Sequence, residues 1–229
     1  MKFVVALAVA IAVEVAIIVA ALARRKRVEE FANESKLCDG VYFKEIPNFL
    51  SARECDALVE ASADLRPSEV GGSSVSVLDE SIRRSMQTWY PPGAHRVTDA
   101  IREKTKALVR STGCLRGRRV KFEHVQVVRY GKGGKYDAHY DGDECEKGSC
   151  PRDQRLATLL VYLNDDFEGG KTHFPLLDAS VVPEKGKALF FWVADEETRE
   201  LFEKTLHAGV PVTRGRKWIA NQWIRPAAS

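Results

Sequence analysis

Two residues in this 229-residue chain have types and spacing suited to binding a metal. His139 and Asp141 lie two positions apart in the segment KYDAHYDGDE, residues 135–144. Alternate residues of an extended strand point to the same face, so an imidazole nitrogen and a carboxylate oxygen can reach one ion. His207, in TLHAGVPV, supplies a third ligand if the fold returns that segment to the pair. Two histidines and one carboxylate with open coordination positions are typical of non-haem Fe(II) oxygenases.

A lysine shortly after His207 is suited to binding an anionic cosubstrate. Lys217 begins the predicted strand in GRKWIANQWI, and the alternation of a strand places Trp223 on the same face. A buried lysine needs an anion, and the C5 carboxylate of 2-oxoglutarate fits that need. Tyr130 can add a phenolic hydrogen bond. A solvated strand end is the structural alternative for Lys217.

The elements that must position these residues change in character near Val120. Before it, the segment 50–62 places Ser51 and Glu54 in a capping-box relation and has helical spacing of apolar residues. A second helix is predicted over about residues 98–110. After it come short runs rich in β-branched and aromatic residues, VKFEHVQVVRY, LATLLVYL, ALFFWV and WIANQWI. The pattern predicts an α+β, mainly β fold, with a jelly roll and flanking N-terminal helices.

Four longer segments resemble, in order, the catalytic domain of prolyl 4-hydroxylases. They are VVRYGKGGKYDAHYD, RLATLLVYLNDDFEGGKTHFP, VVPEKGKALFFW and LHAGVPVTRGRKWIANQWI, and the resemblance covers roughly residues 40–226. It implies a double-stranded β-helix core that binds Fe(II) through His139, Asp141 and His207. The other residues that it implies are Tyr130, Thr172, Lys217 and Trp223 around 2-oxoglutarate, and Trp89, Tyr136 and Arg155 around a peptide.

The resemblance also implies an activity. The enzyme would hydroxylate peptidyl proline at C4 with Fe(II), O2 and 2-oxoglutarate, releasing succinate and CO2, and ascorbate would rescue oxidised iron. A proline-rich peptide or protein is a physically apt substrate, because a polyproline II segment is already extended and exposes its ring edges. Two alternatives remain: a 2-oxoglutarate oxygenase that acts on another side chain, such as lysine, or a non-catalytic β-helix binding module.

Three segments bear on the substrate side of the predicted site. Trp89 lies in RRSMQTWY, which resembles the mobile substrate loop of the family. Arg225 stands where many relatives have a histidine two residues after the strand tryptophan. The segment FWVADEETRELFEKTLH, residues 191–207, is predicted to be a charged, helical insertion before the last iron ligand.

The N-terminal segment has a different composition from the rest of the chain. Between Phe3 and Ala23 only Glu14 is strongly polar, and roughly 20 apolar residues are enough to span a bilayer as a helix. We therefore expect a transmembrane or signal-anchor segment at 1–23, a charged linker at 24–39 and a catalytic domain at 40–229. A cleaved signal peptide is the alternative, because ALA precedes RRKR. The basic RRKR itself favours a cytoplasmic body by the positive-inside rule.

The cysteines favour an oxidising compartment instead. Cys145 and Cys150 can close a small loop in CEKGSC, with Cα atoms predicted within about 7 Å. We therefore expect a single-pass protein of the endoplasmic reticulum or another secretory-pathway membrane, anchored through its N-terminal segment. Cys55 lies on an apolar helix face and is expected to be buried. The formal net charge of only +3 argues against a nucleic-acid partner.

Overall fold

Eight antiparallel strands form the main sheet of the computed structural model, which describes residue 40 and residues 42–71, 76–115 and 118–227. They lie in the compact unit Tyr42–Ser229. Their order is β1-β14-β10-β17-β8-β6-β2, and β7 pairs with β17 beside this path. The bounds are β1 Phe43–Ile46, β14 Ala188–Trp192, β10 Ala157–Tyr162, β17 Lys217–Pro226, β8 Val125–Tyr130, β6 Met86–Tyr90, β2 Arg66–Pro67 and β7 Val120–Phe122.

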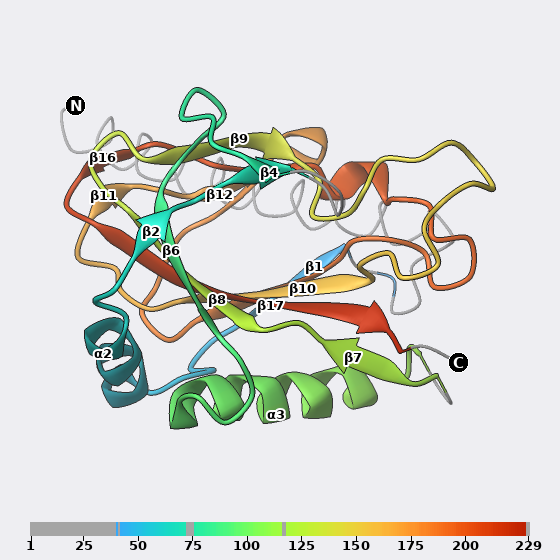
Figure 1. Ribbon diagram of the computed structural model, residues 1–229, viewed down its shortest axis with the longest axis horizontal. Coiled ribbons are helices and arrows are strands. Elements are labelled where there is room, and N and C mark those ends of the chain that lie inside the picture. Colours follow the sequence, from blue (N-terminus) through green and yellow to red (C-terminus); the bar gives the residue numbers. More distant parts are fainter. Residues whose placement is uncertain (1–39, 41, 72–75, 116–117, 228–229) are drawn as a thin grey trace, which may run out of the picture. The chain divides into compact units, whose positions relative to one another are not determined.

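A second, five-stranded sheet faces the main sheet, so that the strands form two layers (Figure 1). Its order is β13-β12-β15-β9-β5, with bounds β13 Ala179–Val181, β12 Thr172–Phe174, β15 His207–Gly209, β9 Lys135–His139 and β5 Arg83–Arg84. Two short pairs complete the described strands: β11 (Glu168–Gly169) with β16 (Val212–Arg214), and β3 (Val70–Gly71) with β4 (Ser76–Val77). The predicted mainly β fold with a jelly-roll core is confirmed.

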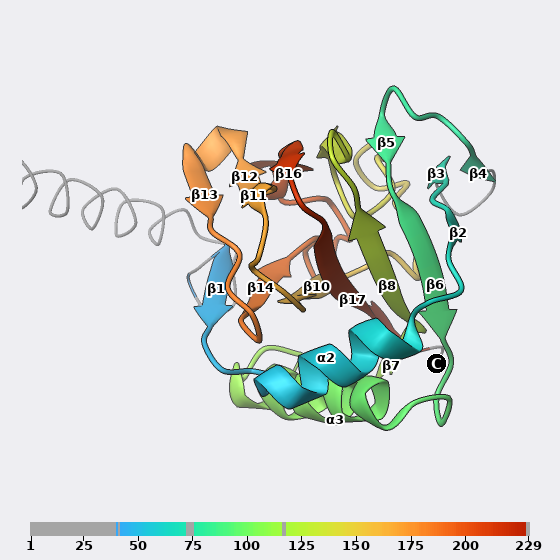
Figure 2. The same ribbon diagram turned by 90° about the vertical axis from the view of Figure 1, so that its left-hand side faces the viewer.

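Two helices cover the face of the main sheet that points away from the second sheet (Figure 2). They are α2 (Ala52–Ala61) and α3 (Arg96–Ser111). The predicted capping box starts α2: Ser51 Oγ accepts from the Glu54 amide at 3.3 Å, and Glu54 Oε2 accepts from the Ser51 amide at 2.7 Å. Cys55 is fully buried, as predicted.

The second helix begins two residues earlier than the sequence predicts. His95 Nδ1 accepts a hydrogen bond from the Val97 amide at 3.2 Å, so an imidazole caps α3 in place of a hydroxyl or carboxylate. Val97 and Ile101 are buried under the sheet. Histidine is not among the usual N-cap residues, and the sequence pattern therefore missed this start.

The hydrophobic core is densest around β10 and β14, in which every residue is buried. The helices cover one face of these strands and the second sheet covers the other (Figures 1 and 2). Burial on both faces explains why ATLLVY and ALFFW are almost continuously apolar instead of alternating. These runs were predicted to be strands, and the prediction is confirmed.

The predicted mobile substrate loop is instead built of strands. Residues 83–90 form β5 and β6, which pair with β9 and β8 respectively. Trp89 lies opposite Gln126 in this ladder. The loop assignment was wrong because β6 adds its MQTWY segment to the edge of an existing apolar strand.

The predicted helix within residues 191–207 is also wrong. The only helical element there is a 3-10 turn, η2 (Glu203–Thr205), and Ala194 and Leu201 form an isolated antiparallel bridge. Asp195 Oδ1 accepts from the amides of Glu197 at 2.9 Å and Thr198 at 2.8 Å. An aspartate that binds nearby amides in this way offers the backbone an alternative to a helix.

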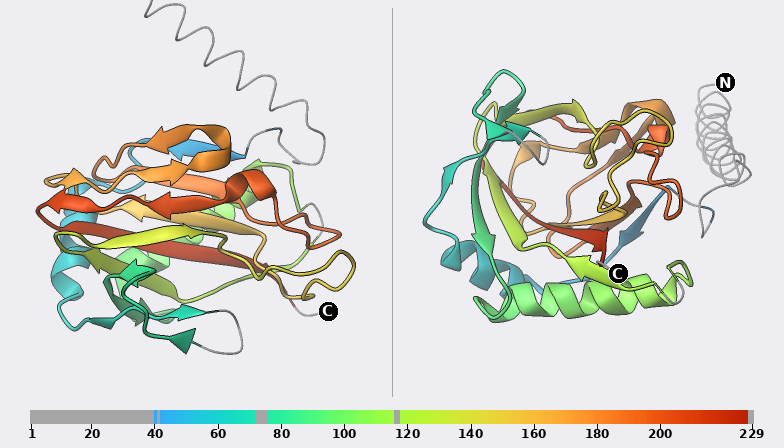
Figure 3. Two further views of the ribbon diagram at one scale, coloured as in Figure 1. Left: turned by 90° about the horizontal axis from the view of Figure 1, so that it is seen from above. Right: turned by 45° about the vertical axis from the view of Figure 1, so that its right-hand side comes forward.

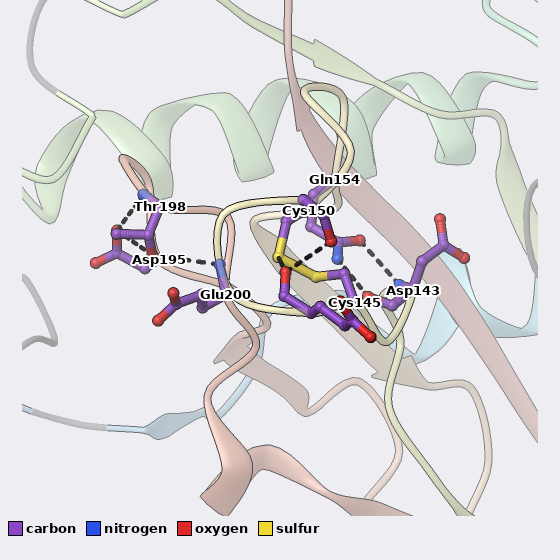
Figure 4. Close-up of a disulfide and its surroundings, with 9 residues drawn as sticks. Asp143, Cys145, Cys150, Gln154, Asp195, Thr198 and Glu200 are labelled. Atoms are coloured by element: carbon purple, nitrogen blue, oxygen red, sulfur yellow. Dashed lines mark hydrogen bonds between the residues drawn. A yellow bond between two sulfur atoms is a disulfide. The ribbon is translucent and has the colours of Figure 1, made fainter.

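The predicted proximity of Cys145 and Cys150 is confirmed. Cys145 and Cys150 are bonded, with their Cα atoms 5.0 Å apart (Figure 4). The bridge closes part of the loop that follows β9. This loop and the loop over residues 193–206 extend from the same end of the sheets (Figure 3), where Arg199 Nε donates to Arg152 O at 3.3 Å.

The prediction of a single-pass protein of the endoplasmic reticulum or another secretory-pathway membrane is corrected. Among the residues that the structure describes, no helix has both the length and the apolar character required to cross a membrane. The segments 1–23 and 24–39, on which the prediction of an anchor and a linker depended, lie outside the described residues.

Candidate functional site

A cavity of about 900 Å³ opens between the two sheets. Strands β9 and β15 supply one wall, and β8 and β17 supply the opposite wall. Every residue that the sequence analysis selected for the site lines this cavity. They are Trp89, Tyr130, Tyr136, His139, Asp141, Arg155, Thr172, His207, Lys217 and Trp223.

The three predicted metal ligands converge at one point in the cavity. His139 ends β9 and His207 begins β15, and the two residues are direct partners across this strand pair. Asp141 Oδ1 lies 3.5 Å from His139 Nε2 and 3.8 Å from His207 Nε2. All three ligand atoms lie within 4.8 Å of one another. Two imidazole nitrogens and one carboxylate oxygen at these separations can bind a single divalent cation.

The hydrogen bonds of both imidazoles direct Nε2 toward this point. His139 Nδ1 is 2.8 Å from the carbonyl of Asp137, and His207 Nδ1 is 2.9 Å from the carbonyl of Thr205. A carbonyl only accepts, so each Nδ1 carries the proton and each Nε2 keeps a free lone pair. Metal-bound histidines are commonly oriented by such contacts. The donor set therefore fits Fe(II).

The electrostatics favour a carboxylate anion at Asp141 beside a neutral imidazole at His207. Burial opposes ionisation of Asp141, but His207, His139 and Arg155 outweigh it and hold the pKa of this carboxyl well below its usual range. Burial and then the neighbouring His139 lower the pKa of His207 to about 4. Metal ligands must be deprotonated, and at neutral pH both of these groups are.

A buried cation lies further along the cavity. Lys217 is only 3 % exposed, and burial lowers the pKa of its ammonium to about 7. Its Nζ donates to Gly170 O at 2.7 Å and lies 5.4 Å from the centre of the Tyr130 ring. Among the described residues, no carboxylate forms an ion pair with Lys217. Thr172 adds a hydroxyl to this part of the cavity, with Oγ1 2.8 Å from Tyr162 Oη.

The strand β17 extends from this lysine along the cavity. Its alternate residues face inward, as the alternation in the sequence predicted. The residues of β17 that line the cavity are Lys217, Ile219, Asn221, Trp223 and Arg225.

Comparison with known proteins places this geometry in a family. Residues 125–225 match the 2OG-Fe(II) oxygenase superfamily. A solved structure, the viral collagen prolyl hydroxylase of Paramecium bursaria Chlorella virus-1 in complex with 2-oxoglutarate, is 47% identical, with a TM-score of 0.73 over 83% of this chain and 99% of that one. The Arabidopsis thaliana protein "Probable prolyl 4-hydroxylase 9" is 31% identical over 81% of this chain and 68% of its own length. The chain belongs to the prolyl 4-hydroxylase family.

As a member of this family, the protein is a 2-oxoglutarate- and Fe(II)-dependent dioxygenase. A further relative, Prolyl 4-hydroxylase 13 of Arabidopsis thaliana, is 28% identical over 79% of this chain and 69% of its own length. The family match over residues 125–225 includes β9 and β15, the strands that supply the converging histidines.

The three residues predicted to contact a peptide line the same cavity as the converging metal ligands. The Tyr136 ring stacks on the His139 ring, with centroids 3.5 Å apart. Trp89 packs beside Trp223, with ring centroids 5.8 Å apart. Arg155 lies over the Trp223 ring, its Cζ 3.9 Å from the centroid. Flat rings on two sides of the cavity are suited to contacting a flat, extended peptide.

Arg155 is held in place by a carboxylate that the sequence analysis missed. Its Nε and Nη2 donate to Glu123 Oε1 and Oε2 at 2.7 and 2.8 Å. Arg225, the departure from the family pattern, donates from Nε to the same Oε1 at 2.6 Å and from Nη1 to Asp153 O at 2.6 Å. Burial opposes the ionisation of Glu123, but the hydrogen bond and charge of Arg155, followed by those of Arg225, lower its pKa.

Thr158 is a second residue that the sequence analysis missed. Its hydroxyl donates to Asp141 Oδ2 at 2.6 Å. It is the one residue with an aliphatic hydroxyl in the apolar run LATLLVYL. A hydroxyl at a buried strand position needs a hydrogen-bond partner, so this threonine was the available signal. Glu123 lies within the single predicted run VKFEHVQVVRY and had no comparable signal.

Proposed function

We propose that this enzyme hydroxylates peptidyl proline at C4, consuming O2 and 2-oxoglutarate and releasing succinate and CO2. The observation that carries the proposal is the convergence of His139, Asp141 and His207 in the cavity that also contains the buried Lys217. Similarity to a collagen prolyl hydroxylase and to two plant prolyl 4-hydroxylases supports proline as the target.

We assign iron binding to His139 Nε2, Asp141 Oδ1 and His207 Nε2. Lys217 would bind the C5 carboxylate of 2-oxoglutarate, because a buried ammonium with only a carbonyl partner is left with two N–H donors for an anion. The hydroxyls of Tyr130 and Thr172 would hydrogen-bond the cosubstrate. Trp223 would form a wall of its pocket.

We assign the peptide to the side of the cavity lined by Trp89, Tyr136 and Arg155. A proline-rich segment in the polyproline II conformation is already extended and leaves its main-chain groups unpaired, so little conformational entropy is lost when it binds. Three of the five N–H donors of Arg155 are bonded to Glu123 and Asp141, which leaves two for peptide carbonyls.

With iron and 2-oxoglutarate bound, the cofactors supply the oxidising chemistry that replaces a C4 hydrogen of proline by a hydroxyl group. The contribution of the chain is orientation. The two histidines and Asp141 would hold the metal, Lys217 would bind the far carboxylate of the cosubstrate, and the aromatic walls would exclude water. We further propose that the catalytic domain extends over residues 40–229 and that ascorbate sustains turnover.

A peptide panel tests this function. The protein is incubated with Fe(II), 2-oxoglutarate and ascorbate, and with proline-rich peptides or matched peptides that carry lysine in place of proline. We expect mass spectrometry to show the addition of one oxygen atom to proline, together with succinate, and His139→Ala to show neither. Oxidation confined to the lysine peptides would assign the enzyme to another side chain. Omission of ascorbate tests its role separately.

A further inference from the structure

The two carboxylate oxygens of Asp141 have different neighbours. Oδ1 faces the Nε2 atoms of His139 and His207, at 3.5 and 3.8 Å. Oδ2 accepts a hydrogen bond from Thr158 Oγ1 at 2.6 Å. One oxygen is thus directed toward the metal-binding point, and the other is bonded to the protein.

Thr158 is well placed to hold that second oxygen. It lies in β10, in the middle of the main sheet, where its register partners are Phe191 on β14 and Trp223 on β17. It is 1 % exposed, and its β-branched side chain is stiff at χ1. Its short hydrogen bond to a carboxylate is of the charge-assisted type, which is stronger than a neutral one.

A separate contact holds the main chain of Asp141. Arg155 Nη1 donates to the carbonyl of Asp141 at 3.0 Å, and Glu123 in turn fixes Arg155. Loss of the Thr158 hydroxyl would leave this backbone contact intact. Only the rotation of the Asp141 carboxylate about its Cβ–Cγ bond would become free.

We infer that Thr158 is a positioning residue that holds Asp141 so that only Oδ1 is presented to the metal. The inference rests on the proposed role of Asp141 as an iron ligand. With Oδ2 restrained, the carboxylate binds through one oxygen and occupies one coordination position. The remaining positions stay available to the cosubstrate and to O2. Without the hydroxyl, Oδ2 lacks its partner, and the carboxylate can turn to offer both oxygens or neither.

Two matched pairs of variants isolate the hydroxyl. Thr158→Val keeps the branched shape and removes the hydroxyl. Thr158→Ser and Thr158→Ala both remove the methyl group, and they differ from each other only in the hydroxyl. Should the valine protein not fold, the serine and alanine pair gives the same contrast.

The readout is binding of Co(II) to the metal-free protein, which requires no turnover. Loss of a group that orients a metal ligand typically weakens metal binding by about 10- to 100-fold. We expect Thr158→Val to raise the Co(II) dissociation constant at least tenfold over wild type, and Thr158→Ala to raise it similarly over Thr158→Ser. The visible absorption bands of Co(II) should change in the two variants without a hydroxyl and stay as in wild type with serine.

The outcomes separate this inference from the proposed function. Equal Co(II) affinity and equal spectra for wild type and the valine or alanine protein would overturn the positioning role and leave the iron site intact. A wild-type protein that binds no Co(II) would overturn the assignment of the iron ligands, and this inference with it. If Thr158→Ser weakens Co(II) binding as much as Thr158→Ala does, the methyl group matters and the hydroxyl does not, which would also overturn the inference.

Discussion

Lys217 Nζ donates to the carbonyl of Gly170 at 2.7 Å, and this is its only hydrogen bond to the described residues. A carbonyl neutralises no charge, and burial lowers the pKa of the lysine to about 7. An incoming carboxylate would restore the charged form. The cavity therefore contains a cation whose protonation is coupled to binding of its proposed ligand.

The first prediction concerns removal of this cation. A charge-assisted contact contributes about 1.5 to 3 kcal/mol, and about 1.4 kcal/mol corresponds to a factor of ten. Lys217→Ala should therefore weaken 2-oxoglutarate binding by roughly one to two orders of magnitude. Metal binding should be unaffected. Titration of the variant with Co(II), and then with 2-oxoglutarate, measures the two affinities. An unchanged affinity for 2-oxoglutarate would remove this lysine from the cosubstrate site.

The second prediction is a pH dependence with a definite sign. Below pH 7 Lys217 is already protonated, so binding of 2-oxoglutarate takes up no proton. Above pH 7 binding must protonate the lysine, and the apparent dissociation constant should rise by up to about tenfold per pH unit. Lys217→Arg keeps its charge at all these pH values and should lack this dependence. Equal pH profiles in the two proteins would contradict the prediction.

A third prediction concerns the metal ligands themselves. His139→Ala leaves one histidine and one carboxylate, so we expect Co(II) binding and turnover to be lost together. His173 provides a matched control. It lies on β12, the strand next to β15, and its Nδ1 contacts Ala179 O and Ser180 Oγ. His173→Ala should retain metal, and isothermal titration distinguishes the two proteins.

The fourth prediction concerns Glu123 and acid stability. Glu123 forms ion pairs with both Arg155 and Arg225, and breaking such a buried set by removing one partner costs about 3 kcal/mol. Because its folded-state pKa lies below the ordinary value, its stabilisation is complete above about pH 4.5 and is lost as pH falls through the lowered pKa. Urea unfolding should show Glu123→Gln to be less stable at pH 7, with a weaker pH dependence below pH 4.5 than wild type.

The disulfide gives the fifth prediction. The loop between Cys145 and Cys150 is short, so replacing both cysteines by serine should lower the free energy of unfolding by only about 2 kcal/mol. At the base of the loop, the Asp143 amide donates to Gln154 Oε1 at 2.9 Å, and Gln154 Nε2 donates to Asp143 O at 2.7 Å (Figure 4). These bonds do not need the bridge, so Co(II) affinity should change less than twofold. A large loss of metal binding would show that the loop holds the ligands.

Strand alternation accounts for most of the site that could be predicted from the sequence. It places Lys217 and Trp223 on one face, and both line the cavity. The same logic predicted the His139 and Asp141 pair, but β9 ends at His139 and Asp141 lies just beyond the strand. The convergence of His207 on this pair could not be predicted from strand alternation, because β15 becomes the neighbour of β9 only through the strand order of the second sheet. The resemblance to a family supplied that order, and periodicity alone could not.

The residues that escaped prediction act through partners that are distant in sequence. Glu123 is 32 positions from Arg155, and Thr158 is 17 positions from Asp141. No local pattern links such residues before the strands are paired. The strands before α3 were missed for a different reason. Several are only two residues long, which is too short for a periodic signal.

Strand β17 fixes the spacing of the residues that line the cavity, because it is paired on both sides. Lys217 is its first residue and Arg225 its second-last, and β8 and β10 pair with it on either side. The distance between the proposed cosubstrate site and the proposed peptide site is therefore set by one paired strand, at about 3.3 Å per residue. Deletion of a single residue from this strand would turn the side chains that follow it to the opposite face and remove their contacts with the cavity.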